Sequence, residues 1–362
     1  MINTESGLYA VNVNKMVEML SDAYVSMINS NTPFNMFPSV MLWGPPGVGK
    51  SQGVKEVAKK IGARTGKKVS VIDVRLLLFN PVDLRGIPTA NEDKTLAVWL
   101  KPKIFDMSPD DDVVNILFLD EISAAPPSVQ AAAYQITLDR TVGEHKLPDN
   151  CIVIAAGNRV TDKSVAYNMP RALANRLCHI EIKGDTDSWH DWAVKKGLHE
   201  YVIGYLEYNP VALMRDGSSG IGMAFPTPRS WEMVSNILNT AKGDFDSVFP
   251  LVVGCVGSSV AISFSTWVDL YDNMPEISDI FEGRNFTVPK ADELRIALRA
   301  AMVSYARKHP DPILINNSID FACRLPWTFR EALLSDYRCI DELRSIIERN
   351  HVYLTAVRDG RL

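Results

Sequence analysis

Five short apolar runs, rich in β-branched residues, alternate with helical stretches in the first half of the sequence. These runs are Val40–Trp43, Val69–Val74, Asn115–Asp120, Cys151–Ala156 and Leu177–Ile182. A parallel sheet is usually covered on both faces, so its strands are apolar along their whole length, and helices connect one strand to the next. The pattern therefore predicts an α/β fold with a doubly wound parallel sheet covered by helices on both faces.

The second half of the sequence is expected to be helical. After Lys183 the strand pattern fades and apolar residues recur at helical spacing, as at Trp231, Val234 and Leu238. A chain of 362 residues is also long for a single core, which favours two domains. We expect a helical lead-in at residues 1–38, an α/β domain at 39–183 with a hairpin insert at about 80–103, and helices at 184–362.

The first apolar run is followed by a glycine-rich loop and then by a helix. The loop reads Gly44-Pro45-Pro46-Gly47-Val48-Gly49-Lys50-Ser51, followed by Gln52, and fits the phosphate-loop pattern G-x-x-x-x-G-K-S. Its glycines allow successive N–H groups to point at a phosphate, while Lys50 reaches the β and γ oxygens and Ser51 ligates Mg²⁺. A glycine-rich turn without a ligand is the alternative. The flanking strand and helix favour ATP and Mg²⁺ as cofactors, bound by residues 44–52.

Two later strands end in polar residues that suit phosphoryl transfer. Asp120 would complete the Mg²⁺ shell, and Glu121 would act as the general base on the attacking water. Asn158, after Gly157, would hydrogen-bond the γ-phosphate and align that water. Acids at a strand end and an Asn after Gly are common in turns, so each signal is weak alone. After a phosphate loop they predict a catalytic site, with Ser51 and Asp120 as metal ligands.

These motifs, followed by a helical region, together resemble the AAA+ ATPases. The segment Arg140–Gly143, with Leu147, Pro148 and Ile152–Asn158 after it, is similar to the R-TVG-LP-VIAAGN pattern of the MoxR-like group in the helix-two-insert clade. The resemblance covers about residues 39–292 and implies that Asn158 is the first sensor. It also implies that the hairpin expected at Asn80–Trp99 is the insert that lines the central pore of related rings.

The resemblance further implies roles for three arginines. Arg171 and Arg176 compete as the arginine finger, which reaches the γ-phosphate of a neighbouring subunit. Arg176 is favoured because it immediately precedes the last core strand, in a position that resembles the family's DRF motif; a helix C-terminal cation is the alternative. Arg229 resembles the second sensor, which acts in cis. A finger that acts in trans requires a homo-oligomer, and a hexamer is expected.

The function that these residues favour is that of a ring ATPase that remodels or loads a client protein. MoxR-like proteins usually act with a partner that carries a von Willebrand factor A domain. The alternatives are a DNA translocase or helicase, and a nucleotide-regulated scaffold with negligible hydrolysis. A net charge of −5 supplies no general attraction for nucleic acid, and the presence of Lys50, Asp120, Glu121 and Asn158 argues against a scaffold.

No membrane or secretory segment is expected. The uncharged stretch Ser247–Trp267 is long enough to span a bilayer, but Pro250 and its glycines and serines favour a buried helix pair. The N-terminus has no basic region followed by an apolar run, so a cytoplasmic location is expected. The five cysteines have no metal-ligand spacing and are expected to be reduced core thiols.

Overall fold

The computed structural model describes residues 7–159, 167, 169, 174–215, 223–241, 245–272, 274, 276–284 and 288–360. The chain divides into two compact units, residues 1–184 and 185–362. The first unit is an α/β domain and the second is helical. Each unit has a hydrophobic core of its own.

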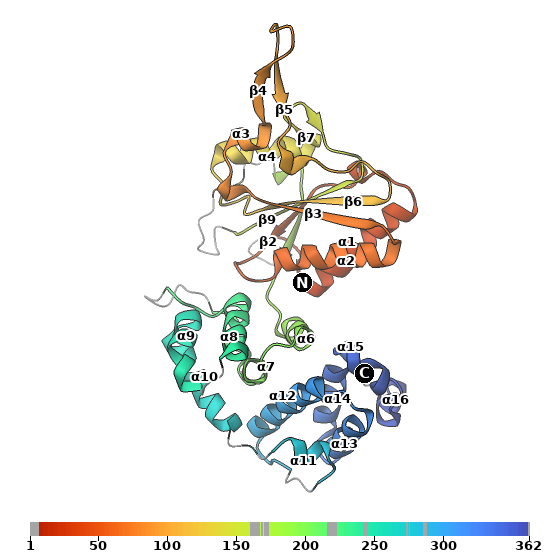
Figure 1. Ribbon diagram of the computed structural model, residues 1–362, viewed down its shortest axis with the longest axis vertical. Helices are drawn as coiled ribbons and strands as arrows, with labels where there is room; N and C mark the ends of the chain where they lie inside the picture. Colours follow the sequence, from red (N-terminus) through yellow and green to blue (C-terminus); the bar gives the residue numbers. More distant parts are fainter. Residues whose placement is uncertain are drawn as a thin grey trace. The chain divides into compact units, whose positions relative to one another are not determined.

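A six-stranded parallel sheet forms the centre of the first unit (Figure 1). The strand order is β1-β10-β2-β9-β6-β3. Five of these strands are the predicted apolar runs, with ends that differ by at most two residues, so the predicted doubly wound sheet is confirmed. The strands are β1 Ala10–Val11, β2 Val40–Trp43, β3 Lys68–Arg75, β6 Val113–Asp120, β9 Cys151–Gly157 and β10 Cys178–Ile182.

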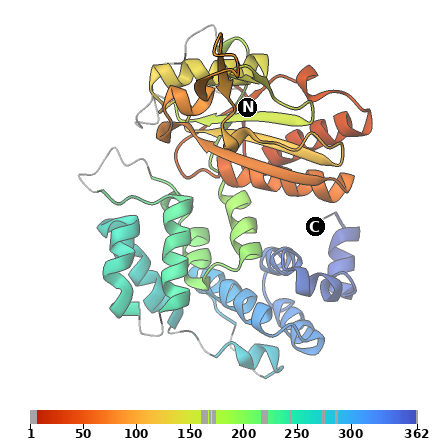
Figure 2. The same ribbon diagram turned by 45° about the horizontal axis from the view of Figure 1, so that its top comes forward.

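Helices cover both faces of this sheet, as the turned view in Figure 2 shows. Helices α1 (Val13–Asn29) and α2 (Lys50–Thr65) pack on one face, and α3 (Pro81–Arg85) and α4 (Pro127–Asp139) pack on the other. Successive residues of a strand point to opposite faces. Leu42 of β2 therefore enters the core with α1 and α2, whereas its neighbour Met41 enters the core with α3 and α4.

The N-terminal lead-in is part of the first unit. Strand β1 pairs with β10 in parallel, and α1 packs against α2. This contact is close at Gly53, where a Cβ atom would lie 2.4 Å from the Met16 methyl carbon. Residues 10–29 therefore support the helix that follows the phosphate loop.

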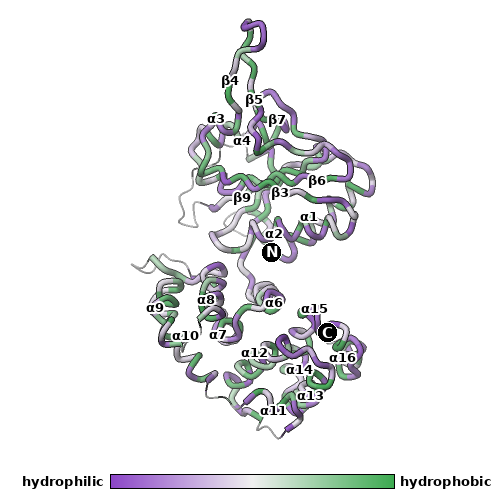
Figure 3. The backbone as a smooth tube through the Cα atoms, in the orientation of Figure 1, coloured by the Kyte–Doolittle hydropathy of each residue, from purple (hydrophilic) through white to green (hydrophobic). Residues whose placement is uncertain are grey.

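Two antiparallel hairpins extend from the first unit. The hairpin in the expected insert pairs β4 (Ile87–Ala90) with β5 (Ala97–Leu100), and a shorter one pairs β7 (Thr141–Val142) with β8 (His145–Lys146). Every residue of β4 and β5 is exposed except Trp99, which is half-buried. The tip of the insert hairpin is hydrophilic, whereas its strands carry apolar residues (Figure 3).

The second unit consists of helices around an aromatic core that includes Tyr205, Trp231 and Phe264. Its helices include α6 Thr186–Lys196, α7 Glu200–Tyr208, α8 Pro228–Thr240, α9 Phe245–Val256, α10 Ser258–Asp272, α11 Ser278–Phe281, α12 Asp292–Lys308, α13 Pro312–Ala322, α14 Trp327–Arg338, α15 Asp341–Ile347 and α16 His351–Arg358. The uncharged stretch forms the predicted helix pair α9 and α10, but the pair is buried only in part, since Leu251 and Ile262 are exposed. Within the described residues, none of the helices has both the length and the apolar character needed to cross a membrane.

One expectation about the cysteines is wrong. Cys151 is buried in the sheet, as a core thiol should be, but Cys323 is exposed. Cys323 follows the last residue of α13, where the chain turns toward α14 at the surface. The expectation came from the absence of CxxC pairs and of metal-ligand spacing, and such spacing does not indicate whether a thiol is buried.

Candidate functional site

The glycine-rich loop connects β2 to α2 at the carboxyl edge of the sheet. Gly47 and Gly49 have φ values of +78° and +101°, a region that side chains with a Cβ atom rarely adopt. A Cβ atom on Gly44 would lie 2.5 Å from the Ile182 carbonyl oxygen. Because α2 begins directly after this loop, the positive end of a 16-residue helix meets the loop backbone. This arrangement is suited to binding an anion.

The Lys50 side chain is buried within the loop. Its ammonium donates to the carbonyl oxygens of Gly44, at 2.5 Å, and Pro45, at 3.1 Å. It also donates to the Asn158 amide oxygen at 2.9 Å. Strand β9 pairs directly with β2, so Asn158 follows the strand next to the loop. The fold therefore brings together two predicted site residues that are 108 positions apart in the sequence.

The side chains of Ser51 and Asp120 are in direct contact. The Ser51 hydroxyl donates to Asp120 Oδ2 at 2.9 Å, and the Glu121 N–H donates to Asp120 Oδ1 at 2.9 Å. A hydroxyl and a carboxylate are hard oxygen ligands of the kind that Mg²⁺ prefers. The donor set therefore fits a magnesium ion.

Glu121 has a left-handed backbone, with a φ of +59°. Such a conformation is strained for a residue other than glycine, and strain of this kind concentrates at functional sites. The Ile122 N–H donates to the Ala156 carbonyl oxygen at 2.9 Å, which fixes the turn after β6 against β9. The sequence predicted the role of Glu121 but not this conformation.

A further carboxylate contributes to the negative charge near Asp120. Partial burial and then the charge of Asp120 raise the pKa of Asp73 in β3, while Arg75 and Lys55 oppose the shift. A divalent cation bound by Asp120 would reduce this repulsion. The electrostatics thus agree with the donor set.

Ser123 positions Asn158 and was missed by the sequence analysis. Its hydroxyl oxygen accepts a hydrogen bond from the Asn158 N–H at 2.9 Å. A Cβ atom on Gly157 would lie 2.7 Å from that same oxygen, so only glycine permits the contact without a shift. The sequence offered one signal for this contact. Ser123 lies three residues after the strand end at Asp120, and Gly157 and Asn158 lie at the end of the next strand of the sheet.

The structure describes two of the three predicted arginines, and these two lie in different units. Arg176 is exposed and lies in the turn just before β10. Arg171 lies outside the described residues. Arg229 is exposed near the start of α8 in the second unit, where the Thr227 side chain caps the helix. Arg176 belongs to the first unit and Arg229 to the second.

Two further polar contacts lie in the first unit. The sequence alone could not predict them, because they depend on which strands are neighbours in the sheet. Trp43 is hydrogen-bonded to His179 across β2 and β10. Arg159, which follows Asn158, forms an ion pair with the buried carboxylate of Glu181. Both contacts join residues more than 20 positions apart.

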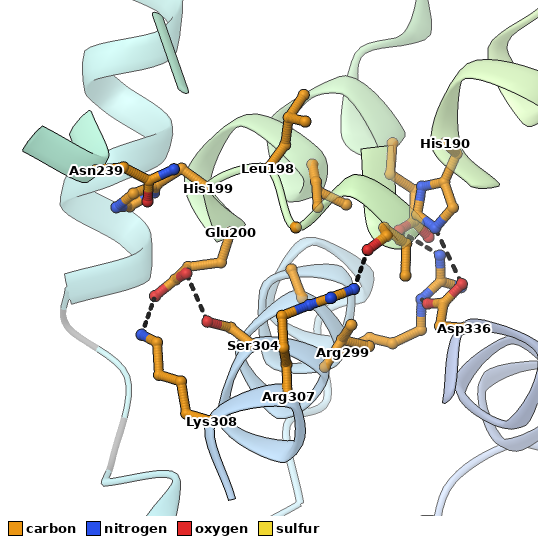
Figure 4. A pocket seen from close by; sticks show the side chains of 16 residues that line it. His190, Leu198, His199, Glu200, Asn239, Arg299, Ser304, Arg307, Lys308 and Asp336 are labelled. Atoms are coloured by element: carbon orange, nitrogen blue, oxygen red, sulfur yellow. Dashed lines mark hydrogen bonds and ion pairs between the residues drawn. The ribbon is translucent and has the colours of Figure 1, made fainter. Parts of the chain in front are cut away.

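The second unit contains a cavity of about 100 Å³ between α6, α7, α8, α12 and α14 (Figure 4). The Arg299 guanidinium lies between Glu207 and Asp336, and His190 Nε2 lies 3.0 Å from Asp336 Oδ1. Burial lowers the pKa of His190, but the hydrogen bond and charge of Asp336 outweigh it, so the pKa is raised. These charged groups are paired with one another, and none of the predicted site residues that the structure describes lines this cavity.

Residues 40–181 match the family model described as "ATPase family associated with various cellular activities (AAA)". The matched region includes the phosphate loop, Asp120, Glu121, Asn158 and Arg176. No curated protein sequence matches the chain.

The chain also matches solved structures at low similarity. Caenorhabditis elegans PCH-2 is 13% identical with a TM-score of 0.34, and the match covers 82% of this chain and 70% of that one. Brucella abortus NtrX is 14% identical with a TM-score of 0.38, covering 92% and 67%. A Thermotoga maritima RuvB mutant is 14% identical with a TM-score of 0.36, covering 83% of each chain.

Proposed function

We propose that this chain is an ATPase that hydrolyses Mg-ATP at the carboxyl edge of β2, β9 and β6. The observation that carries the proposal is the pairing of Lys50 with Asn158 and of Ser51 with Asp120. Asp120 and Asn158 lie at the ends of two different strands, and their side chains converge on Lys50 and Ser51 at the end of one glycine-rich loop. A loop without a ligand has no need for such convergence.

The residues present fit ATP and Mg²⁺. Residues 44–52 would hold the phosphates through backbone N–H groups and the Lys50 ammonium, and Ser51 and Asp120 would hold the metal. Bound Mg²⁺ would neutralise charge on the β and γ oxygens. Glu121 would take the proton of the attacking water, and Asn158 would orient that water.

The proposed enzyme acts as a homo-oligomeric ring, with a hexamer as the expected size. Arg176 is exposed in the turn before β10, which supports a role at the site of a neighbouring subunit rather than at its own. There its charge would compensate the negative charge of the transition state. Arg229 would act as the second sensor from the helical unit.

The proposed substrate of the ring is a protein, as the MoxR-like resemblance implies. Ile87 and Leu100 are 63% and 57% exposed, and they lie directly opposite each other on the insert hairpin. Exposed apolar pairs of this kind favour contact with a protein. The hairpin tip carries Glu92, Asp93 and Lys94, which do not form the basic and aromatic grip that single-stranded nucleic acid requires. A partner with a von Willebrand factor A domain fits this proposal.

The variant Glu121→Gln tests the activity. The amide keeps the shape of the side chain but is not a base, so ATP affinity should persist while turnover falls by about 10²-fold or more. ATP-dependent oligomers should accumulate. Lys50→Ala is the matched control, because it should lose ATP binding itself. Wild-type turnover in Glu121→Gln would overturn the assignment, and negligible turnover in the native chain would favour the scaffold.

A further inference from the structure

A chain of two hydrogen bonds connects the strand before the phosphate loop to the turn that contains Arg176. Trp43, the last residue of β2, donates from Nε1 to His179 Nδ1 at 2.8 Å. His179 Nε2 lies 2.7 Å from the Ala174 carbonyl oxygen. The two rings are nearly parallel, with centroids 6.0 Å apart and planes 15° apart.

The chemistry of these groups fixes one form of His179. An indole N–H can only donate, so Nδ1 of His179 must be unprotonated in order to accept. A carbonyl oxygen can only accept, so Nε2 must carry the proton. His179 is therefore the neutral Nε2–H tautomer, and it makes both hydrogen bonds at once.

The carbonyl that His179 contacts closes the turn of Arg176. The Leu177 N–H also donates to the Ala174 carbonyl oxygen, at 3.4 Å, which is a long hydrogen bond. The bond from His179 is the shorter of the two. Leu177 is buried, so Arg176 lies in a short segment held at one end by the contacts to the Ala174 carbonyl and at the other by the burial of Leu177.

We propose that His179 is a positioning residue for Arg176. Its hydrogen bond to the Ala174 carbonyl fixes the position of the turn from which Arg176 reaches the neighbouring subunit's nucleotide. Its hydrogen bond with Trp43 connects that turn to the phosphate loop of its own subunit. The inference rests on the proposed function of Arg176 in trans. A misplacement of about 1 Å at a catalytic group can cost about 10²-fold in rate, so loss of these bonds should be measurable.

Mixed oligomers separate this role from a general structural one. One subunit carries Glu121→Gln and keeps a native Arg176, while the other carries Arg176→Ala and keeps a native site. ATP turnover in the mixture then comes only from interfaces where Arg176 of the first subunit serves the site of the second. This pair, with native His179, is the reference.

His179→Leu is then placed in one subunit at a time. In the Glu121→Gln subunit, which supplies the arginine, it should lower turnover about 10-fold or more. In the Arg176→Ala subunit, which supplies the site, turnover should stay within about two-fold of the reference. Equal losses in both placements, or no loss in either, would overturn the inference.

Two milder variants test the same inference in case the His179→Leu chain does not fold. Trp43→Phe keeps an aromatic ring and removes only the indole donor, and His179→Gln keeps an amide donor for the Ala174 carbonyl. Both should give intermediate losses in the arginine-supplying subunit only, with ATP affinity unchanged. Native turnover from both variants would also overturn the inference. If the reference pair itself shows no turnover, then the trans role of Arg176 fails, and the role of His179 falls with it.

Discussion

The Lys50 ammonium lies 2.9 Å from the Asn158 amide oxygen, so one hydrogen bond joins the phosphate loop to the tip of the neighbouring strand. The Asn158 N–H is held in turn by Ser123. An amide fixed at its backbone and paired through its oxygen has its NH₂ group oriented before any substrate arrives. Preorganisation of this kind is a large source of rate enhancement in enzymes.

Replacement of this amide tests its role. Asn158→Ala should lower ATP turnover by about 10²-fold, because a fixed donor to the water or phosphate is lost. ATP affinity should change by only a few-fold, since the loop backbone and Lys50 remain. Steady-state turnover and equilibrium binding of ATP measure the two effects. Ser123→Ala, which frees only the Asn158 N–H, should give a smaller loss, and native turnover in Asn158→Ala would contradict the assignment.

The left-handed backbone of Glu121 predicts that glycine at this position gives a more stable protein than alanine. Glu121→Gly and Glu121→Ala should both abolish turnover, because both lack the carboxylate. Glycine adopts a φ of +59° without strain, so the glycine variant should be more stable than the alanine variant by about 1 kcal/mol. Urea unfolding of the two variants measures the difference. Equal stabilities would show that the turn relaxes when the carboxylate is removed.

The raised pKa of His190 predicts a pH-dependent contribution to the stability of the second unit. The pKa is raised from 6.5 in the folded chain, so protonation stabilises the fold. The contribution is fully present below pH 6.5 and is lost as the pH rises through the folded pKa. The groups around the ring are Asp336 and Glu207, which favour the charged form, and Arg299, which opposes it.

His190→Leu should remove this contribution. At acidic pH the variant should be less stable than the native chain by roughly 1 to 2 kcal/mol, since a charge-assisted hydrogen bond to Asp336 is lost. The gap should shrink above neutral pH. Hydrogen exchange of the α6 and α14 amides measures it within this unit, with the exposed His351→Ala as control. A gap that does not vary with pH would contradict the prediction.

The local sequence pattern predicted the sheet and most of the phosphate loop, because each of these features is formed by residues that are contiguous in the sequence. Buried parallel strands are continuous apolar runs, so Val40–Trp43 and Cys151–Ala156 could be identified directly. The two-residue strand β1 could not be predicted, because Ala10–Val11 is too short to show a pattern. The phosphate loop, Asp120 and Asn158 were predicted because each lies within a few residues of an apolar run.

The contacts that orient these groups depend on strand register and could not be predicted. Trp43 and His179 meet only because β2 pairs with β10 in a register that sets His179 opposite Met41. They are 136 residues apart, and neither lies in a recognisable motif. The contact of Ser123 with Asn158 likewise depends on how the turn after β6 meets β9.

The insert hairpin separates the protein-remodelling proposal from the DNA-motor alternative. Ala90 and Ala97 form the outermost pair of β4 and β5, so residues 91–96 form the tip. Replacing this tip with the dipeptide Asn-Gly should preserve the strands, because that sequence favours a tight two-residue turn. None of the phosphate-loop residues lies in the hairpin, so basal ATPase activity should persist.

The variant and the native chain are compared with DNA and with protein clients. A DNA motor should be stimulated by single- or double-stranded DNA, with a steep salt dependence from counterion release at phosphate contacts. We expect no such stimulation at low salt in either chain. Proteins that the Glu121→Gln trap retains in an ATP-dependent manner should be lost when the tip is also replaced, whereas the same-length variant Glu92→Ser should retain them. Strong stimulation by DNA that disappears with the tip would instead establish the DNA-motor alternative, because the hairpin would then be acting on a polyanion.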